Sequence, residues 1–171
     1  MYDSSYTVLA FLEGGYLRYL VFSDVGAPGS LITVASGVDD FDFSPDYDGY
    51  IDFVYVRGGF LYHQRLNTLG TIIYGEAAIL SGSTNLYHPQ VICVGKQNDY
   101  VLHIAICNNI TGSERDIGYL RMSSAATVIT PYLKWVGLTA NLQDASLAKD
   151  EDDSLLFLAF VNADTGKAYL H

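Results

Sequence analysis

Apolar residues along this chain gather in short runs, separated by turns rich in glycine and acidic residues. Two typical runs are YIDFVYV at 50–56 and SLLFLAFV at 154–161. Both hold many β-branched and aromatic residues with few polar interruptions, which is typical of strands covered on both faces. Glycine follows at 58–59 and at 166, where a tight hairpin requires positive φ. The pattern predicts β-strands joined by hairpins, with no helical spacing between them.

A longer pattern recurs four times along the chain. Each copy contains an acidic turn, an apolar run, a tight turn or longer loop, and then an aromatic residue followed by leucine. These aromatic residues are Tyr16, Phe60, Tyr119 and Tyr169, spaced 44, 59 and 50 residues apart. A further apolar strand precedes or follows most copies, so one full repeat contains four antiparallel strands. Four-stranded units at this period predict a β-propeller.

We therefore expect an all-β fold: one propeller domain, or part of one, covering residues 1–171. Its four units should span about 1–37, 38–80, 81–138 and 139–171. The first unit lacks its first strand and the last lacks its fourth, which predicts three, four, four and three strands. A β-sandwich whose strands resemble one another by chance is the alternative, although chance does not readily repeat the same order of features four times.

The incomplete end units raise the question of how the propeller closes. A blade of four strands about 4.8 Å apart and about 18 Å long presents roughly 350 Å² per face. Leaving one such face uncovered forfeits on the order of 9 kcal/mol of burial. Three arrangements avoid this: the chain is a piece of a longer propeller, several copies form a homo-oligomer that covers the open faces, or this chain closes alone as a small four-bladed ring.

Composition narrows the classes of partner. The chain has a net charge of −10, which argues against nucleic acid and against an anionic membrane surface. No apolar stretch is long enough to span a bilayer, and the start MYDSSYTVLAF lacks the basic region of a signal peptide. Of the possible locations we favour an extracellular or virion-associated one.

The two cysteines, Cys93 and Cys107, lie in neighbouring apolar segments. If these segments form a hairpin that turns near Gln97, Cys93 faces a residue near Val101. Cys107 is then about six positions further along, which is too far for a disulfide. We expect two buried free thiols.

The segment SPDYDGYIDFVYVRGGFLYHQRL, at 44–66, resembles the blades of sialidase-like propellers. Similar repeats occur in bacterial lectins and in propeller modules of phage tails. The resemblance covers nearly the whole chain, but it is a resemblance of scaffold and does not carry function. The Asp-box of sialidases is absent, no arginine-rich signature marks a carboxylate-binding triad, and Trp135 is the only tryptophan, unlike the fucose-binding propellers with one per blade.

Other chemistry leaves weaker signals. The acidic clusters at 39–48 and 150–153 lack the spacing of a calcium loop, so we expect solvated turns and no metal. The four histidines have no metal-ligand spacing, and His103 reads as a packed residue of an apolar strand. No nucleophile elbow is present. A pair of catalytic carboxylates for glycoside hydrolysis is possible, but no feature of the sequence selects it.

Exposed aromatic side chains could bind a sugar by stacking against its flat face. Tyr87, Tyr132 and Trp135 lie near predicted blade loops or outer strands and are our candidate ligand-binding residues. The leading hypothesis is a non-catalytic binding or structural module without a cofactor, which recognises a glycan or protein in the manner of a lectin-like or viral module. The alternatives are an incomplete sialidase-like glycoside hydrolase and a self-assembling architectural propeller.

Overall fold

The structure is a computed structural model. It describes residues 6–23, 25–46, 48–80, 85–96, 99–111, 114–123, 125–134, 142–150 and 155–170, and gives the backbone alone for residues 96, 99, 110, 111, 114, 115 and 132–134. Within these ranges every regular element is a strand, so no helix there could cross a membrane. The predicted all-β class is confirmed.

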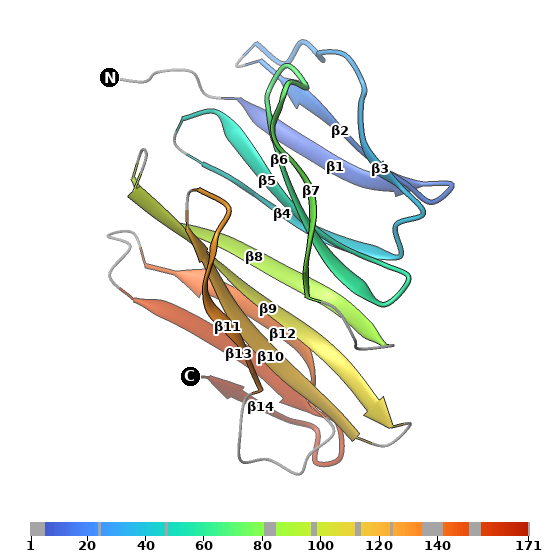
Figure 1. Cartoon of the computed structure of the whole chain (residues 1–171), viewed down its shortest axis with the longest axis vertical. Coiled ribbons are helices and arrows are strands. Elements are labelled where there is room, and N and C mark those ends of the chain that lie inside the picture. The colour runs from blue at the N-terminus through green and yellow to red at the C-terminus, as the bar shows by residue number, and fades with distance from the viewer. Residues whose placement is uncertain are drawn as a thin grey trace.

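The described residues form fourteen strands in four antiparallel sheets, and each sheet is a simple meander (Figure 1). The first sheet contains β1 (Thr7–Glu13), β2 (Tyr16–Phe22) and β3 (Ile32–Ser36). The second contains β4 (Asp40–Pro45), β5 (Tyr50–Arg57), β6 (Phe60–Asn67) and β7 (Ile72–Leu80). The third contains β8 (Leu86–Lys96), β9 (Asp99–Thr111), β10 (Glu114–Ser123) and β11 (Val128–Lys134). The fourth contains β12 (Leu142–Lys149), β13 (Leu156–Asn162) and β14 (Lys167–Leu170). The predicted strand counts of three, four, four and three are confirmed.

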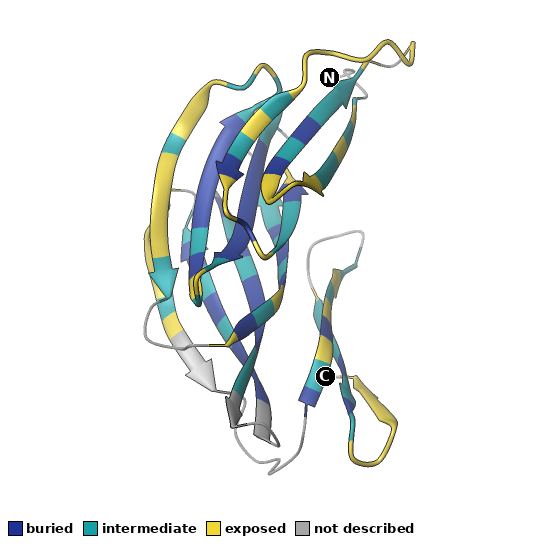
Figure 2. Cartoon of the chain, turned by 90° about the vertical axis from the view of Figure 1, so that its right-hand side faces the viewer, coloured by how far each residue is buried: buried dark blue, intermediate teal, exposed yellow. Residues whose placement is uncertain are grey.

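Consecutive sheets pack face to face, because their strands are apolar on both sides. Along β5, Phe53 and Tyr55 face the first sheet, whereas Val54 and Val56 face the third. Buried residues run along the strands inside the stack, and exposed residues mark the outer strands and turns (Figure 2). The interfaces are formed by Leu17, Tyr19, Phe53 and Tyr55 between the first and second sheets, by Val54, Val56, Leu102 and Ile104 between the second and third, and by Ala105, Cys107, Leu158 and Phe160 between the third and fourth.

The four sheets form an open arc. The first sheet lies at one end of the long axis and the fourth at the other (Figure 1). A four-bladed ring closed by this chain alone would bring these two sheets together, so that arrangement is not the one the described residues adopt. Completion by a longer chain or by further copies stays a prediction.

The repeated aromatic–leucine pair lies on β2, β6, β10 and β14, and it begins the strand in β2 and β6. The hairpin before Phe60 contains Gly58 and Gly59 at φ 57° and 80°, which confirms the expected glycine turn. Leu61 packs toward the third sheet, but Leu120, its counterpart in the third sheet, packs back toward the second. The longer hairpin between β9 and β10 changes the register by an odd number of residues, and such a change moves every side chain to the opposite face.

The two cysteines are free and buried, as predicted. Cys93 lies opposite Leu102, one residue from the expected Val101. Burial and the nearby charges of Asp52 and Asp46 raise the pKa of the Cys93 thiol to about 12. This thiol is therefore protonated at neutral pH and unsuited to nucleophilic chemistry.

Candidate functional site

The first strand of the second sheet binds the first strand of the third through its side chains. Alternate residues of β4 point to one side and accept hydrogen bonds from backbone N–H groups at the edge of β8. The bonds are Asp40 Oδ2 from His88 N (2.8 Å), Asp42 Oδ2 from Val91 N (2.8 Å) and Ser44 Oγ from Cys93 N (3.0 Å). Both residue numbers increase together, so β4 and β8 run in the same direction. These bonds satisfy edge groups of β8 that would otherwise be buried without partners.

Asp42 is the carboxyl group in this ladder with a strongly shifted proton affinity. Its partial burial between β4 and β8 raises its pKa to about 6, and the negative charge of Asp40 contributes in the same direction. The N–H groups of Val91 and Phe43 act in the opposite direction but do not offset burial. A carboxylic acid with a pKa near 6 keeps a proton close to neutral pH, which is the property required of a general acid.

The strands β8 and β12 each carry an extra residue near their start. The register of β8 shifts between Tyr87 and Gln90, and that of β12 shifts between Gln143 and Ser146. Within these bulges, His88 and Asp144 have φ of 48° and 56° and exposed side chains. They occupy the same position, two residues after the first residue of each strand. Bulges of this kind re-aim side chains and are common beside functional sites.

The three predicted ligand-binding residues are not brought together by what the structure describes. Tyr87 is half-buried on β8, packs toward the fourth sheet and lies edge-on to the His88 ring at 5.2 Å. Tyr132 belongs to β11, at the opposite edge of the same four-stranded sheet. Trp135 lies outside the described residues. The proposed sugar-stacking role of these residues stays a prediction.

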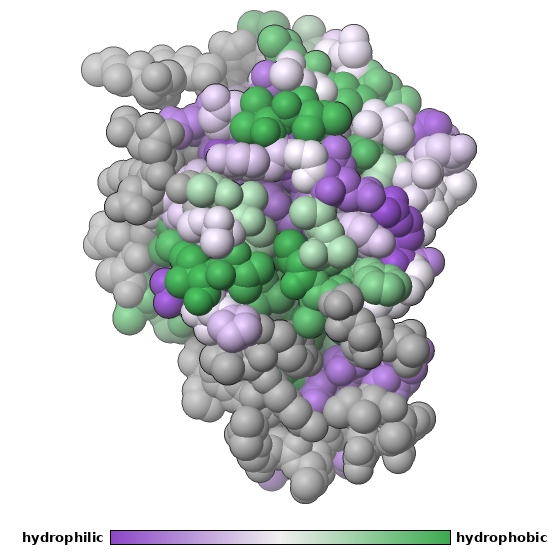
Figure 3. Space-filling view, viewed as in Figure 1, coloured by the Kyte–Doolittle hydropathy of each residue, from purple (hydrophilic) through white to green (hydrophobic). Residues whose placement is uncertain are grey.

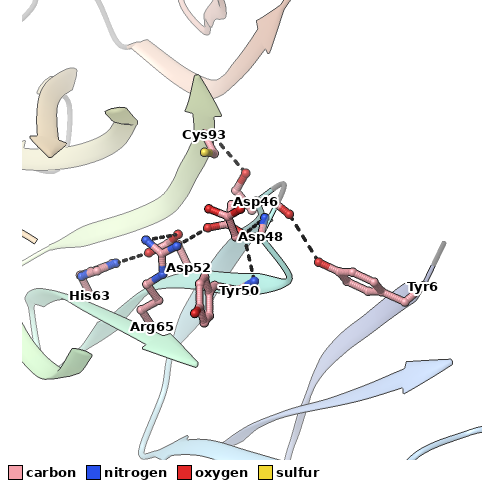
Figure 4. A network of polar contacts seen from close by, with 9 residues as sticks. Tyr6, Asp46, Asp48, Tyr50, Asp52, His63, Arg65 and Cys93 are labelled. Carbon is pink, nitrogen blue, oxygen red and sulfur yellow. Dashed lines mark hydrogen bonds and ion pairs between the residues drawn. The ribbon is translucent and has the colours of Figure 1, made fainter. Parts of the chain in front are cut away.

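A second polar cluster lies deeper, between the second and third sheets (Figure 4). Arg65 forms an ion pair with Asp46 and lies over the rings of Tyr50 and Tyr100, at 4.7 and 4.5 Å from their centroids. Beside it, Asp52 Oδ1 lies 2.8 Å from Nε2 of His63. The side chains of these four ionisable residues are at most 4% exposed, so a substrate has no access to them. The cluster therefore packs between the two sheets, where Arg65 lies over Tyr100 of the third sheet, and it does not form a reaction centre.

The structure corrects the expectation that the acidic cluster at 39–48 consists of solvated turns. Asp40 and Asp42 bind backbone groups of β8, and Asp46 accepts the N–H groups of Asp48 and Tyr50 at 2.8 and 2.9 Å. Their side chains are hydrogen-bonded inside or between sheets because the hairpin folds them back onto backbone donors. In the described part of the chain, no group of three or more histidine, cysteine, aspartate or glutamate residues is placed to hold a metal ion.

His103 was expected to be a packed residue of an apolar strand, and it is half-buried on β9. Its Nδ1 lies 2.5 Å from the hydroxyl of Tyr119. Burial and the nearby Arg121 lower the pKa of His103 to about 4, so its ring is neutral at neutral pH. This pair crosses from β9 to β10 within one sheet and serves packing.

Comparison with known proteins supports the fold and leaves the family open. No protein-family profile matches the sequence, and no curated protein is significantly similar to it. Solved structures do match. An endo-arabinase from Bacteroides thetaiotaomicron VPI-5482 superimposes with a TM-score of 0.55 at 16% identity, over 99% of this chain and 70% of that one.

Two further matches are glycoside hydrolase family 43 (GH43) proteins. A bifunctional GH43-CE protein from Bacteroides eggerthii gives a TM-score of 0.53 at 14% identity, and a mutant of BlXynB from Bacillus licheniformis gives 0.52 at 13%. The chain covers 24% and 38% of these proteins, so it spans well under half of their length. At such low identity the likeness establishes the fold alone: the four sheets are blades of a β-propeller.

Proposed function

We propose that this chain forms part of a glycan-cleaving propeller, in which Asp42 is the general acid and Asp40 the base. The observation that carries the proposal is the raised pKa of Asp42 beside a second carboxylate on the same strand. Two residues apart on an extended strand, their Cα atoms are separated by roughly 6.8 Å. Both side chains point from β4 toward β8, and glycosidases hold their two carboxyl groups roughly 5–9.5 Å apart, so a Cα separation of this size supports the assignment.

In this proposal each carboxyl group has one task. Protonated Asp42 donates its proton to the oxygen of the leaving sugar, and the carboxyl group of Asp40 takes a proton from the water that attacks the sugar. The hydrogen bonds from His88 N and Val91 N hold the two side chains in fixed rotamers on the strand. The similar solved structures support the choice of reaction, since they include an endo-arabinase and GH43 proteins, one of them a Bacteroides ovatus xyloglucan GH43B protein.

The test is hydrolysis of arabinan oligosaccharides, xyloglucan oligosaccharides and small fluorogenic glycosides by the full-length protein. Asp42→Asn and Asp40→Asn keep an acceptor for the β8 N–H groups but cannot transfer the proton, so we expect turnover to fall roughly 10²–10⁴-fold. Asp48→Asn makes the same chemical change in the turn after β4 and should leave turnover intact. Activity should also decline above about pH 6, as Asp42 loses its proton. Full turnover in both Asn variants would refute the assignment.

Glycan recognition without cleavage is the second candidate. It is favoured by the fact that both carboxylates already accept backbone N–H groups, which is a sufficient structural reason for their presence. Under this alternative the protein binds oligosaccharides with no turnover, and Asp42→Asn leaves binding unchanged. Measurements of oligosaccharide binding and hydrolysis therefore separate the two functions.

A further inference from the structure

A cluster of charged and aromatic side chains lies on the face of the second sheet that points toward the first. It consists of Arg57, Phe60, Tyr62 and Glu76, here called the Arg57 platform, and is contributed by β5, β6 and β7. Arg57 and Phe60 are direct partners across the hairpin of β5 and β6, and Arg57 reaches the carbonyl of Ser36 at the end of β3. The platform lies outside the Asp40–Asp42 ladder and plays no part in it.

The ion pair of the platform is held in one geometry. Nη1 and Nη2 of Arg57 donate to the two carboxylate oxygens of Glu76 at 2.9 and 2.5 Å. The hydroxyl of Tyr55 donates to the same carboxylate at 2.5 Å, and the guanidinium lies 4.3 Å from the ring centroid of Tyr62. Because Tyr55 and Tyr62 hold this bidentate pair in one geometry, its polar groups are preorganised to bind a ligand.

The pair nevertheless remains accessible. The side chains of Arg57 and Glu76 are 30% and 35% exposed, so part of each charged side chain is open to the solvent. Hydrogen bonding from Arg57 lowers the pKa of Glu76, which therefore stays ionised and able to accept hydroxyl groups. Because the two charges neutralise each other, the platform presents hydrogen-bonding groups without a net charge.

An exposed ring completes the platform. Phe60 is 41% exposed and its ring packs at a tilt on Tyr62, with 6.3 Å between centroids. The equivalent aromatic of the first sheet, Tyr16, is 45% exposed, but its neighbouring pair of Arg18 and Glu13 has a single nitrogen–oxygen contact with Glu13 63% exposed. The second sheet therefore differs from the first by its rigid bidentate pair beside the exposed ring. Figure 3 shows polar and apolar surface side by side over the second sheet.

We propose that Arg57, Phe60 and Glu76 bind one neutral sugar residue of the glycan, as a subsite separate from the Asp40–Asp42 pair. The apolar C–H face of the sugar stacks on Phe60, one hydroxyl donates to Glu76, and a neighbouring hydroxyl accepts from Arg57. An anionic sugar is disfavoured, because Glu76 already neutralises Arg57 and the chain carries a net charge of −10. This inference rests on the proposed glycan function and names the kind of sugar involved.

The position of the platform explains how one glycan could reach both sites. Val56 pairs with Asp40, and Arg57 is the next residue, so the Cα atoms of Arg57 and Asp40 are about 6 Å apart. The two side chains point to opposite faces of the second sheet. A glycan bound at both must therefore cross the end of this sheet, where the N–H of Gly58 donates to Asp39 Oδ2 at 3.1 Å. Only a substrate of several sugar residues can make that crossing.

The experiment measures binding and turnover in the full-length protein with arabinan and xyloglucan oligosaccharides of increasing length. In an Asp42→Asn background, which prevents cleavage, Phe60→Ala and Glu76→Gln should each weaken binding of the long oligosaccharides roughly 5- to 30-fold. In the wild-type background, the same two changes should raise KM for the long oligosaccharides far more than KM for a single-sugar fluorogenic glycoside. Tyr16→Ala removes the equivalent exposed ring of the first sheet and should change neither measurement. Thermal melts confirm that each variant is folded.

The outcomes separate this inference from the function on which it rests. One outcome is that Phe60→Ala and Glu76→Gln bind long oligosaccharides as tightly as Tyr16→Ala does, although the wild-type protein cleaves them. In that case the proposed subsite is wrong and the proposed function stands. If polygalacturonate binds more tightly than the neutral oligosaccharides, the assignment of a neutral sugar is overturned. If no glycan is bound or cleaved, both the subsite and the proposed function fail.

Discussion

Replacing Arg65 by methionine tests how much the buried ion cluster between the second and third sheets stabilises the fold. Methionine preserves much of the packing volume against Tyr50 and Tyr100 but removes the charge that faces Asp46 and Asp52. The carboxyl groups of Asp46 and Asp52 would then remain buried without the guanidinium group. Removing one partner of such a pair costs about 3–5 kcal/mol, because the other charge stays desolvated. For a domain of this size, that cost corresponds to a drop of roughly 6–20 °C in Tm.

The chain contains a matched control for this change. Arg18 pairs with Glu13 at the surface, where the two side chains are 26% and 63% exposed. Surface pairs of this kind contribute about 0–1 kcal/mol, so Arg18→Met should lower Tm by no more than a few degrees. The assay is thermal and urea unfolding of the full-length protein and both variants. A loss in Arg65→Met no larger than that in Arg18→Met would refute the view that the buried cluster stabilises the fold.

Three further predictions concern single positions. Asp42 has a pKa of about 6 in the fold and 3.8 when free, so its ionisation lowers the free energy of unfolding as pH rises from about 4 to 6. Asp42→Asn should therefore raise the free energy of unfolding by on the order of 2 kcal/mol at pH 7 and leave it unchanged near pH 3. Equal shifts in Tm at both pH values would contradict this. Ser44→Ala leaves the N–H of Cys93 without its acceptor at 3.0 Å, which should cost about 1–3 kcal/mol and speed hydrogen exchange at that amide; unchanged exchange would count against the ladder. Gly58→Ala forces a side chain into φ 57° and should cost about 1–2 kcal/mol, whereas Gly75→Ala, in open space on β7, should not destabilise; equal melts for the two variants would disprove the turn argument.

The architecture was predictable because it is encoded locally and then repeated. Apolar runs such as 50–56, followed by Gly58 and Gly59, specify a strand and a tight turn from neighbouring residues alone. Four copies of one pattern then specify four similar sheets. The free cysteines followed from the same reasoning, since a hairpin register fixes which residues face each other.

The candidate site was harder to predict because it depends on contacts between units. The acidic residues of β4 read as solvated turns in the sequence, and only the packing of β4 against β8 shows that Asp42 is shielded from water. Asp52, His63 and Arg65 are separated by ordinary spacing within apolar strands. Their alternation is the one signal in the sequence that could have placed them together on one face.

By itself, the sequence determined the strand order, the hairpin turns and the four repeated units, because each depends on residues close together in the chain. Only the tertiary structure decided that the four sheets form an open arc and that Asp42 holds its proton to about pH 6. It also decided that Leu120 of the third sheet packs toward the preceding sheet, whereas Leu61 of the second packs toward the following one. These properties depend on which sheet faces which and on how much water is excluded between them. Burial and charge proximity of that kind arise between residues about 50 positions apart, such as Asp42 and Val91, and no local pattern encodes them.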